Sequence, residues 1–155
     1  MTSGQDVVET YRDWIRNNVT DPNSTRRTAG KQWVYDDVPR LDVRDYPRIS
    51  ILNPSAISEP HGLCSNDQKF SPVVDIQVRV KKNMKMRVGS STFNSLQLLN
   101  YVSKEITDQL KTSSFRTEVL DQDSVFYSAL EFENTINTGE LIQIRQLLYK
   151  NILTR

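Results

Sequence analysis

Apolar positions near the start of the chain recur at the spacing of a helix. They are Val7, Val8, Tyr11, Trp14, Ile15 and Val19, and charged residues lie between them. This pattern predicts an amphipathic helix from Gly4 to Asn18 whose apolar face packs in the core. Ser3 is a suitable N-cap, and Asp21-Pro22 follows the predicted end of the helix.

The next part of the chain, residues 20–45, is polar and interrupted by proline and glycine. It predicts a loop or extended arm that is longer than compact domains usually contain without a purpose. Within the arm, Lys31–Tyr35 could form a short strand with Trp33 and Tyr35 on the same face. Aromatic side chains in a polar arm usually cover a surface, so both are candidate interaction residues.

Strict alternation of apolar and polar residues marks the clearest predicted strand, Val73–Lys81. Its apolar residues point one way, and the opposite positions are Asp75, Gln77, Arg79 and Lys81. One face should therefore pack on a core while the other is wet, either simply solvated or available to a partner. A shorter alternation predicts a strand over Arg48–Leu52, which Asn53-Pro54 should end.

The C-terminal half combines a second helix with further strands. An apolar stripe predicts the helix over Thr92–Lys111, and Phe115–Leu120 should be extended. Alternation predicts a strand over Ser124–Glu133, followed by a turn-rich connection at 134–139. Glu140–Ile152 then completes a β-hairpin, although its length leaves a helix possible.

These elements predict one domain, residues 1–155, with an α+β fold. We expect a small, mostly antiparallel sheet with two flanking helices, a long extended N-terminal arm and a C-terminal β-hairpin. The apolar runs are far shorter than a membrane span requires, and the N-terminus lacks the basic and apolar regions of a secretory signal. Twenty basic and nineteen acidic residues give a formal net charge of +1, which argues against extensive wrapping by nucleic acid.

Residues that could carry catalysis or bind a metal are sparse. His61 is the only histidine, and Cys64, the only cysteine, follows it three positions later in the same loop. Neither residue has a partner at a spacing that indicates hydrolysis or a zinc site, and no glycine-rich phosphate loop is present. Aspartates at 36, 37, 42 and 45 could bind a hard cation or could simply be solvated. We therefore expect no enzyme activity, no metal and no cofactor, and we expect His61 to be dispensable.

Basic residues are the best candidates for contacts with a partner. Four of them form a basic cluster: Lys81, Lys82, Lys85 and Arg87. Around them, residues 83–88 either continue the preceding strand or form a turn. The residues between these cations are mostly methionine and valine rather than aromatic, so line contact with a phosphate backbone is more plausible than base stacking. In the arm, Arg26 and Arg27 could hold a phosphate or an acidic partner, or could be solvated.

The order of the predicted elements resembles the tail terminator, or tail completion, family of tailed viruses. In that family an N-terminal helix precedes a strand that an aromatic-Pro-basic step introduces, matched here by Tyr46-Pro47-Arg48. A further strand, a helix and a last hairpin follow in the same order, matched by Val73–Lys81, Leu96–Leu110 and Val125–Tyr149. The resemblance covers most of the chain in order, and the long arm departs from a minimal member of the family.

The resemblance implies a structural virion protein without catalytic residues. Such proteins form a homo-oligomeric, hexameric ring that caps the tail tube and joins it to the head connector. The implied partners are the tail tube protein and the connector or adaptor, with passing contact to genomic DNA. The implied location is the virion neck, after assembly in the host cytoplasm. In such a ring, neighbouring subunits would order the arm. A head-closure or connector adaptor remains an alternative, and a nucleic-acid-binding module is the alternative of another class.

Overall fold

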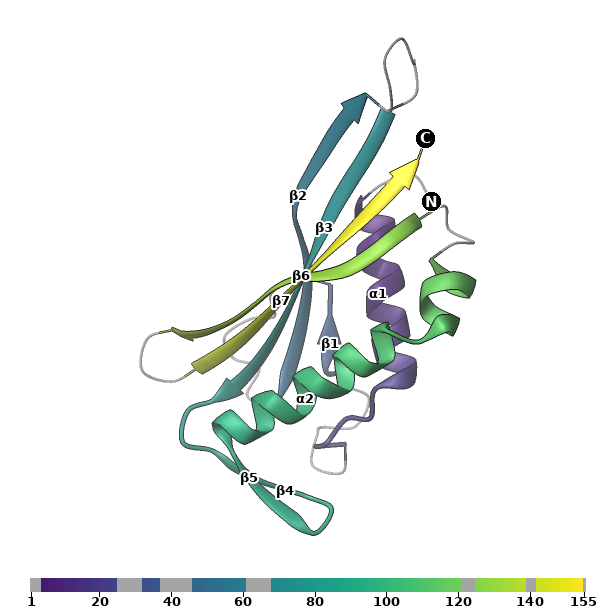
Figure 1. The fold of residues 1–155 in the computed structure, drawn as a ribbon. Helices are drawn as coiled ribbons and strands as arrows, with labels where there is room; N and C mark the ends of the chain where they lie inside the picture. The colour runs from purple at the N-terminus through teal and green to yellow at the C-terminus, as the bar shows by residue number, and fades with distance from the viewer. Residues whose placement is uncertain are drawn as a thin grey trace.

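The computed structural model describes residues 4–24, 32–36, 46–60, 68–120, 125–138 and 142–154. The elements, in chain order, are α1 (Gly4–Asn18), β1 (Val34–Tyr35), β2 (Arg48–Pro60), β3 (Gln68–Lys81), β4 (Lys85–Val88), β5 (Ser91–Asn94), α2 (Ser95–Leu110), the π-helical segment η1 (Ser114–Val119), β6 (Val125–Thr138) and β7 (Ile142–Thr154). Figure 1 shows a twisted sheet with α1 and α2 packed beside it.

The main sheet has five strands in the order β1-β2-β3-β7-β6. The short β1 pairs with β2 in parallel, and every other neighbouring pair in this sheet is antiparallel. β4 and β5 form a separate two-stranded antiparallel sheet. The expectation of an α+β fold with a mostly antiparallel sheet and two main helices is therefore confirmed.

Both helices cover the same face of the main sheet. The alternating residues of β3 that face them are fully buried: Val74, Ile76, Val78 and Val80. α1 packs over β1, β2 and β3, while α2 packs over β3 and β7. We call the opposite side the open face, because none of the described helices covers it (Figure 1).

An aromatic group joins the first helix to the C-terminal part of the chain. The Tyr11 ring meets the Phe115 ring edge to face, with centroids 5.0 Å apart. The Trp14 ring also contacts Phe115, and the centroids of these two rings are 5.2 Å apart. The Tyr11 hydroxyl donates to Asn151 Oδ1 of β7 at 2.6 Å. The helix predicted over 4–18 is thus present, and its apolar face packs in the core as its spacing indicates.

The second helix begins three residues later than predicted. Residues 91–94 pair with β4 instead of joining the helix. Asn94 then caps α2 by accepting from the Gln97 amide at 2.9 Å, while the Gln97 side chain accepts from the Asn94 amide at 3.0 Å. This reciprocal capping box satisfies two amide groups at the helix start and fixes its first residue.

Other predicted elements also differ from the structure. β2 does not stop at Asn53-Pro54 but runs to Pro60, with an irregular register between Leu52 and Ser55. The 115–120 segment is mostly helical rather than extended, because it carries the fully buried Phe115 into the aromatic group. β6 continues through the predicted turn to Thr138.

Some predictions fall on parts of the chain that the structure does not describe. Residues 139–141, between the paired strands β6 and β7, lie outside the described residues. Of the predicted arm, the structure describes 20–24 and 32–36. None of the described helices is long and apolar enough to cross a membrane.

Candidate interaction surfaces

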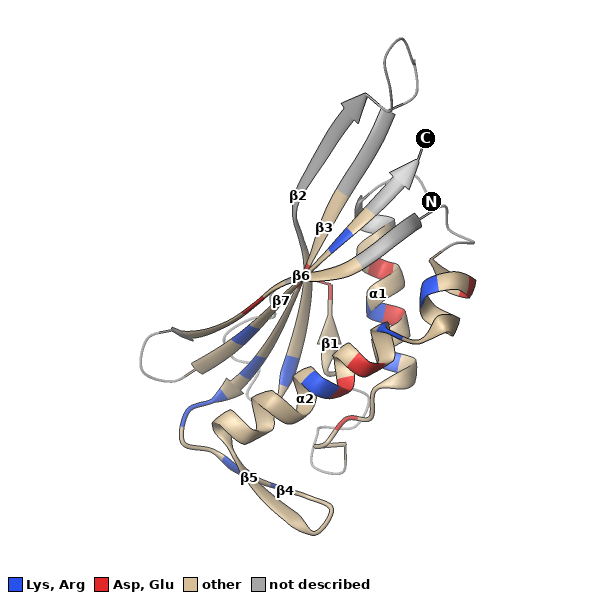
Figure 2. Cartoon of the chain, viewed as in Figure 1, with Lys and Arg blue, Asp and Glu red and all other residues tan. Residues whose placement is uncertain are grey.

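The basic cluster lies where β3 ends and along β4. Lys81 is the last residue of β3, and a turn through Asn83, with φ of 58°, leads into β4. Residues 83–88 therefore turn and start a new strand, which settles the two alternatives left by the sequence. Lys81, Lys85 and Arg87 are exposed, and Lys82 is partly exposed. Figure 2 shows these cations in blue at one end of the molecule.

Core packing and hydrogen bonds fix the position of β4, the strand that carries Lys85 and Arg87. Met86 is 5% exposed and belongs to the core, with Val88 and Phe93 packed against it. The Ser95 hydroxyl donates to the Lys81 carbonyl at 2.7 Å and accepts from the Met84 amide at 3.1 Å. The cations thus alternate with anchored residues, and β4 presents Lys85 and Arg87 outward on a fixed backbone.

The two aromatic candidates of the arm have different environments. Trp33 is 4% exposed and belongs to the core, so the chain itself supplies the surface that this ring covers. Its carbonyl accepts from the Ile49 amide at 2.8 Å. Tyr35 is only partly buried, and its hydroxyl donates to the Gln32 carbonyl at 2.6 Å. Of this pair, Tyr35 is the one accessible to a partner.

Other candidates from the sequence lie outside the described residues: Arg26, Arg27, His61 and Cys64. Within the described part, no group of histidine, cysteine and acidic side chains is placed to hold a metal ion. The candidates that the structure describes are the basic cluster, Trp33 and Tyr35.

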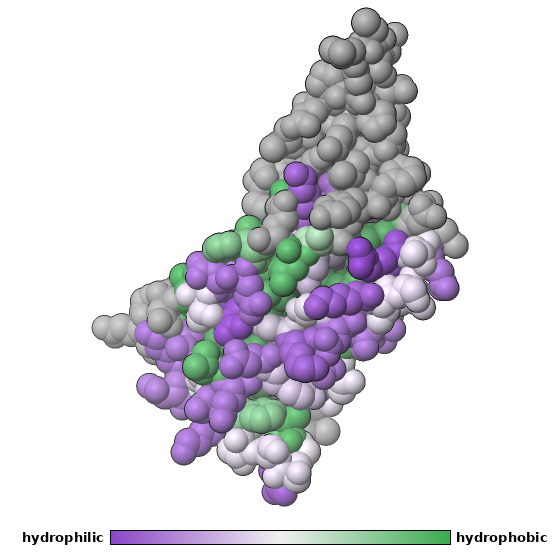
Figure 3. Space-filling model, in the orientation of Figure 1, coloured by the Kyte–Doolittle hydropathy of each residue, from purple (hydrophilic) through white to green (hydrophobic). Residues whose placement is uncertain are grey.

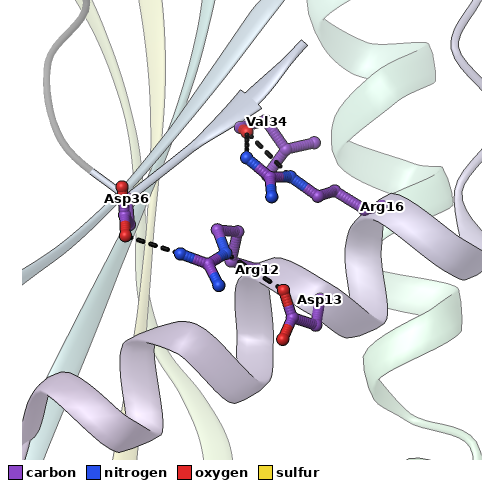
Figure 4. A network of polar contacts seen from close by, with 5 residues as sticks. All are labelled: Arg12, Asp13, Arg16, Val34 and Asp36. Atoms are coloured by element: carbon purple, nitrogen blue, oxygen red, sulfur yellow. Dashed lines mark hydrogen bonds and ion pairs between the residues drawn. The ribbon is translucent and has the colours of Figure 1, made fainter. Parts of the chain in front are cut away.

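Two arginines of α1 close the β1 edge of the sheet (Figure 4). Arg16 donates from Nε and Nη2 to the Val34 carbonyl, at 3.1 and 2.7 Å. Arg12 Nη1 donates to Asp36 Oδ2 at 2.6 Å, and its Nε donates to Asp13 Oδ1 at 3.0 Å. Desolvation lowers the pKa of Arg12, but the carboxylates of Asp13 and Asp36 outweigh it and raise the pKa. A carbonyl that would otherwise be open to another strand is thus already occupied.

The open face carries a hydrogen-bonded polar row that the sequence analysis placed in water. Arg79 donates to Ser50 Oγ and to Gln77 Oε1, both at 2.5 Å. Asp75 Oδ2 accepts from Gln77 at 2.9 Å and from Gln146 at 3.1 Å. Asp75 is only 4% exposed and Arg79 only 9%. The expectation of a wet face is wrong at these two positions, because side chains of three strands lie across one another.

This row places like charges close together. Arg48 lies opposite Arg79 on the neighbouring strand, and its guanidinium sits 4.4 Å from the centre of the Tyr46 ring. Burial lowers the pKa of Arg79, and the positive charge of Arg48 lowers it further, while Asp75 acts in the opposite direction. The alternation in β3 could show which residues share a face. It could not show that side chains of the neighbouring strands β2 and β7 would bury Asp75 and Arg79.

The other edge of the sheet, β6, is open along the described residues. Among the described strands, β6 pairs only with β7. Residues 132–135 are all exposed, and Phe132 is one of two exposed large hydrophobic residues, at 47%. Next to this edge, the open face pairs Phe132 with Leu148 and Ile136 with Ile144. On the face seen in Figure 3, hydrophobic residues lie in small groups among hydrophilic ones.

A polar hollow of about 340 Å³ lies between α2 and the strands β6 and β7. At its side, Arg145 donates to Glu133 at 2.6 Å and to Asn100 at 2.7 Å. These contacts tie α2 to both strands. The residues lining the hollow mix both signs of charge, so it shows no preference for an anion or a cation.

No model of a protein family matches the chain, and no curated protein matches it in sequence. The function is therefore argued from the fold and its surfaces.

Proposed function

We propose that this chain is a structural virion protein, a ring subunit at the head–tail neck that terminates or completes the tail tube and joins it to the head connector. One observation carries the proposal, namely the order of the elements. α1 precedes β2, which follows Tyr46-Pro47, and β3, α2 and the antiparallel pair of β6 and β7 come after it. This order is the one by which the sequence resembles the tail terminator family.

The exposed features of the described chain support a subunit that functions by binding other proteins. The open face lacks a covering helix in the described part, β6 offers an unpaired edge, and β4 presents cations on a fixed backbone. A formal net charge of +1 suits a ring through which DNA passes, because a strongly basic lumen would bind phosphates tightly.

Electron microscopy of the purified chain mixed with assembled tail tubes tests this proposal. Two-dimensional class averages should show a ring with a central channel, bound at the end of the tube. Binding to the isolated head connector, without binding to the tube, would favour the head-closure or adaptor alternative. A monomer that retards DNA and binds neither structure would contradict the neck proposal.

Variants in the basic cluster distinguish the ring proposal from the nucleic-acid-binding alternative. Charge reversal at Lys82 and Lys85 should weaken ring assembly more than DNA affinity, since we place the basic cluster at a subunit contact or, as a loop, on the ring lumen. Lys104→Glu is the matched control, because Lys104 lies on α2 with a side chain 75% exposed. Loss of DNA binding with intact assembly would instead support the nucleic-acid-binding module.

The arm provides a third test of the ring. We propose that in the ring neighbouring subunits order the arm predicted over residues 20–45, apart from β1. Hydrogen exchange should show protection of this segment in the ring and not in the free chain. β1 is the internal control, since Arg16 and β2 already hold it within one chain. Equal protection of the arm in both forms would contradict the idea.

A further inference from the structure

The two edges of the main sheet differ in their capacity to accept another strand. At β1, Arg16 occupies the Val34 carbonyl and α1 packs alongside. At β6, the described structure places no strand, and residues 132–135 are exposed. An unpaired strand leaves backbone amide and carbonyl groups available to a further strand. Within the described residues, β1 covers only Ile49 and Ser50 of β2, so β6 is one of the stretches of this sheet that a further strand could join.

The side chains of β6 favour one register of pairing with a second copy of the same strand. In antiparallel pairing about a two-fold axis, residues opposite each other must lie on the same face of the sheet. The axis must therefore pass between the two copies of a single residue, which lie opposite each other. An axis at Glu133 would set two carboxylates opposite each other, which is destabilising. An axis at Asn134 sets position 132 opposite 136 and position 133 opposite 135.

The register centred on Asn134 is self-complementary. On the open face it places Phe132 of each copy against Ile136 of the other, an aromatic and β-branched pair of a favourable kind. On the helix side it places Glu133 against Thr135, so no like charges meet. At the axis the two Asn134 side chains face each other, and an amide can both donate and accept.

We propose that the free chain forms a two-fold dimer in which β6 pairs antiparallel with β6 of a second copy, centred on Asn134. The register irregularity between Leu130 and Phe132 limits the regular overlap. The interface is correspondingly small, and we expect a dissociation constant on the order of micromolar. A two-fold contact closes on itself and makes no ring. The inference therefore concerns the unassembled chain and does not depend on the proposed neck function.

Disulfide trapping tests the register. In a Cys64→Ser background, Asn134→Cys should cross-link two copies under mild oxidation, since residues on the axis lie within the span of a disulfide. Thr135→Cys is the matched control. Its counterpart in the second copy is diagonal, about 7–8 Å away, which is too far for a disulfide. Cross-linking at 135 but not at 134, or at neither, would overturn the proposed register.

Sedimentation equilibrium tests the dimer itself. Over about 1 to 500 μM the wild-type chain should pass from monomer to dimer. Phe132→Lys should weaken the dimer about tenfold or more, because each dimer loses two Phe132–Ile136 pairs. Leu96→Lys is the control, since Leu96 is 49% exposed and lies on α2, away from the β6 edge. A monomer throughout this range, a ring without a dimer, or equal effects of both variants would overturn the proposal.

Discussion

Two buried tyrosines, Tyr11 and Tyr149, have ring centroids 6.0 Å apart, and we expect the loss of the hydroxyl to change stability differently at each. Tyr11 is fully buried and donates to Asn151 Oδ1 at 2.6 Å. Tyr149 is 4% exposed, and within the described part its hydroxyl has no hydrogen-bond partner. Tyr11→Phe should destabilise the fold, whereas Tyr149→Phe should be neutral or stabilising. Both variants keep the aromatic ring, so they isolate the hydroxyl.

The magnitude for Tyr11→Phe follows from the environment of Asn151. This residue is fully buried, and its amide nitrogen already donates to the Tyr149 carbonyl at 3.2 Å. The side chain is therefore held in place, and water cannot replace the lost donor. A buried acceptor left unpaired costs about 1–3 kcal/mol, so we expect the free energy of unfolding to fall by about 2 kcal/mol. For a domain of this size, that loss lowers Tm by about 4–8 °C.

Urea unfolding followed by tryptophan fluorescence measures both variants, since the Trp14 ring lies in the same aromatic group. The Asn151→Ala background completes the test, because there Tyr11→Phe should lose most of its effect. The reasoning is refuted if the two tyrosine variants change stability equally, or if Tyr11→Phe costs less than about 0.5 kcal/mol.

Two other substitutions and one pH titration test features of the fold. Arg16→Met should remove both bonds to the Val34 carbonyl, cost about 1–3 kcal/mol and speed amide exchange in β1, with Arg116→Met on the exposed face of η1 as control. Asn94→Ala should cost about 1 kcal/mol in thermal unfolding, because it removes the cap of α2. Burial raises the pKa of the Tyr149 phenol above its ordinary value of 10.0, and the negative charge of Glu133 adds to the rise. The unfolded chain therefore loses this proton first, and stability should fall as pH rises above about 10, less steeply in Tyr149→Phe. Equal slopes for wild type and variant in alkaline urea titrations would contradict this assignment.

The local pattern predicts the elements whose periodicity is strong. The helix over Gly4–Asn18 and the buried face of β3 both follow from spacing alone. The pattern fails where contacts far along the chain decide the outcome. Asn53-Pro54 reads as a stop, yet β2 continues because β3 pairs with it as far as Pro60. The sequence around Phe115 predicts an extended segment. In the structure Phe115 belongs to a helical segment, and its ring is buried against Tyr11.

The candidate surfaces show the same division. Charge spacing identifies the basic cluster, and three of its four cations are exposed. Trp33, chosen as an aromatic in a polar arm, is buried instead, because β1 joins the sheet beside Ile49. The polar row and the open β6 edge depend on strand order. That order brings Ser50, Gln77 and Gln146 side by side, and no local pattern encodes it.

The closure of the β1 edge limits what this sheet can build. A sheet with two accessible edges can add copies at both ends and polymerise without limit, which is the geometry of a fibre. With Arg16 on the Val34 carbonyl, the sheet cannot readily add a strand beside β1, which covers Ile49 and Ser50 of β2. A copy that pairs through β6 therefore cannot extend the sheet past β1 as well. A chain that must accumulate at high concentration before assembly would gain solubility from two arginine bonds on one short strand.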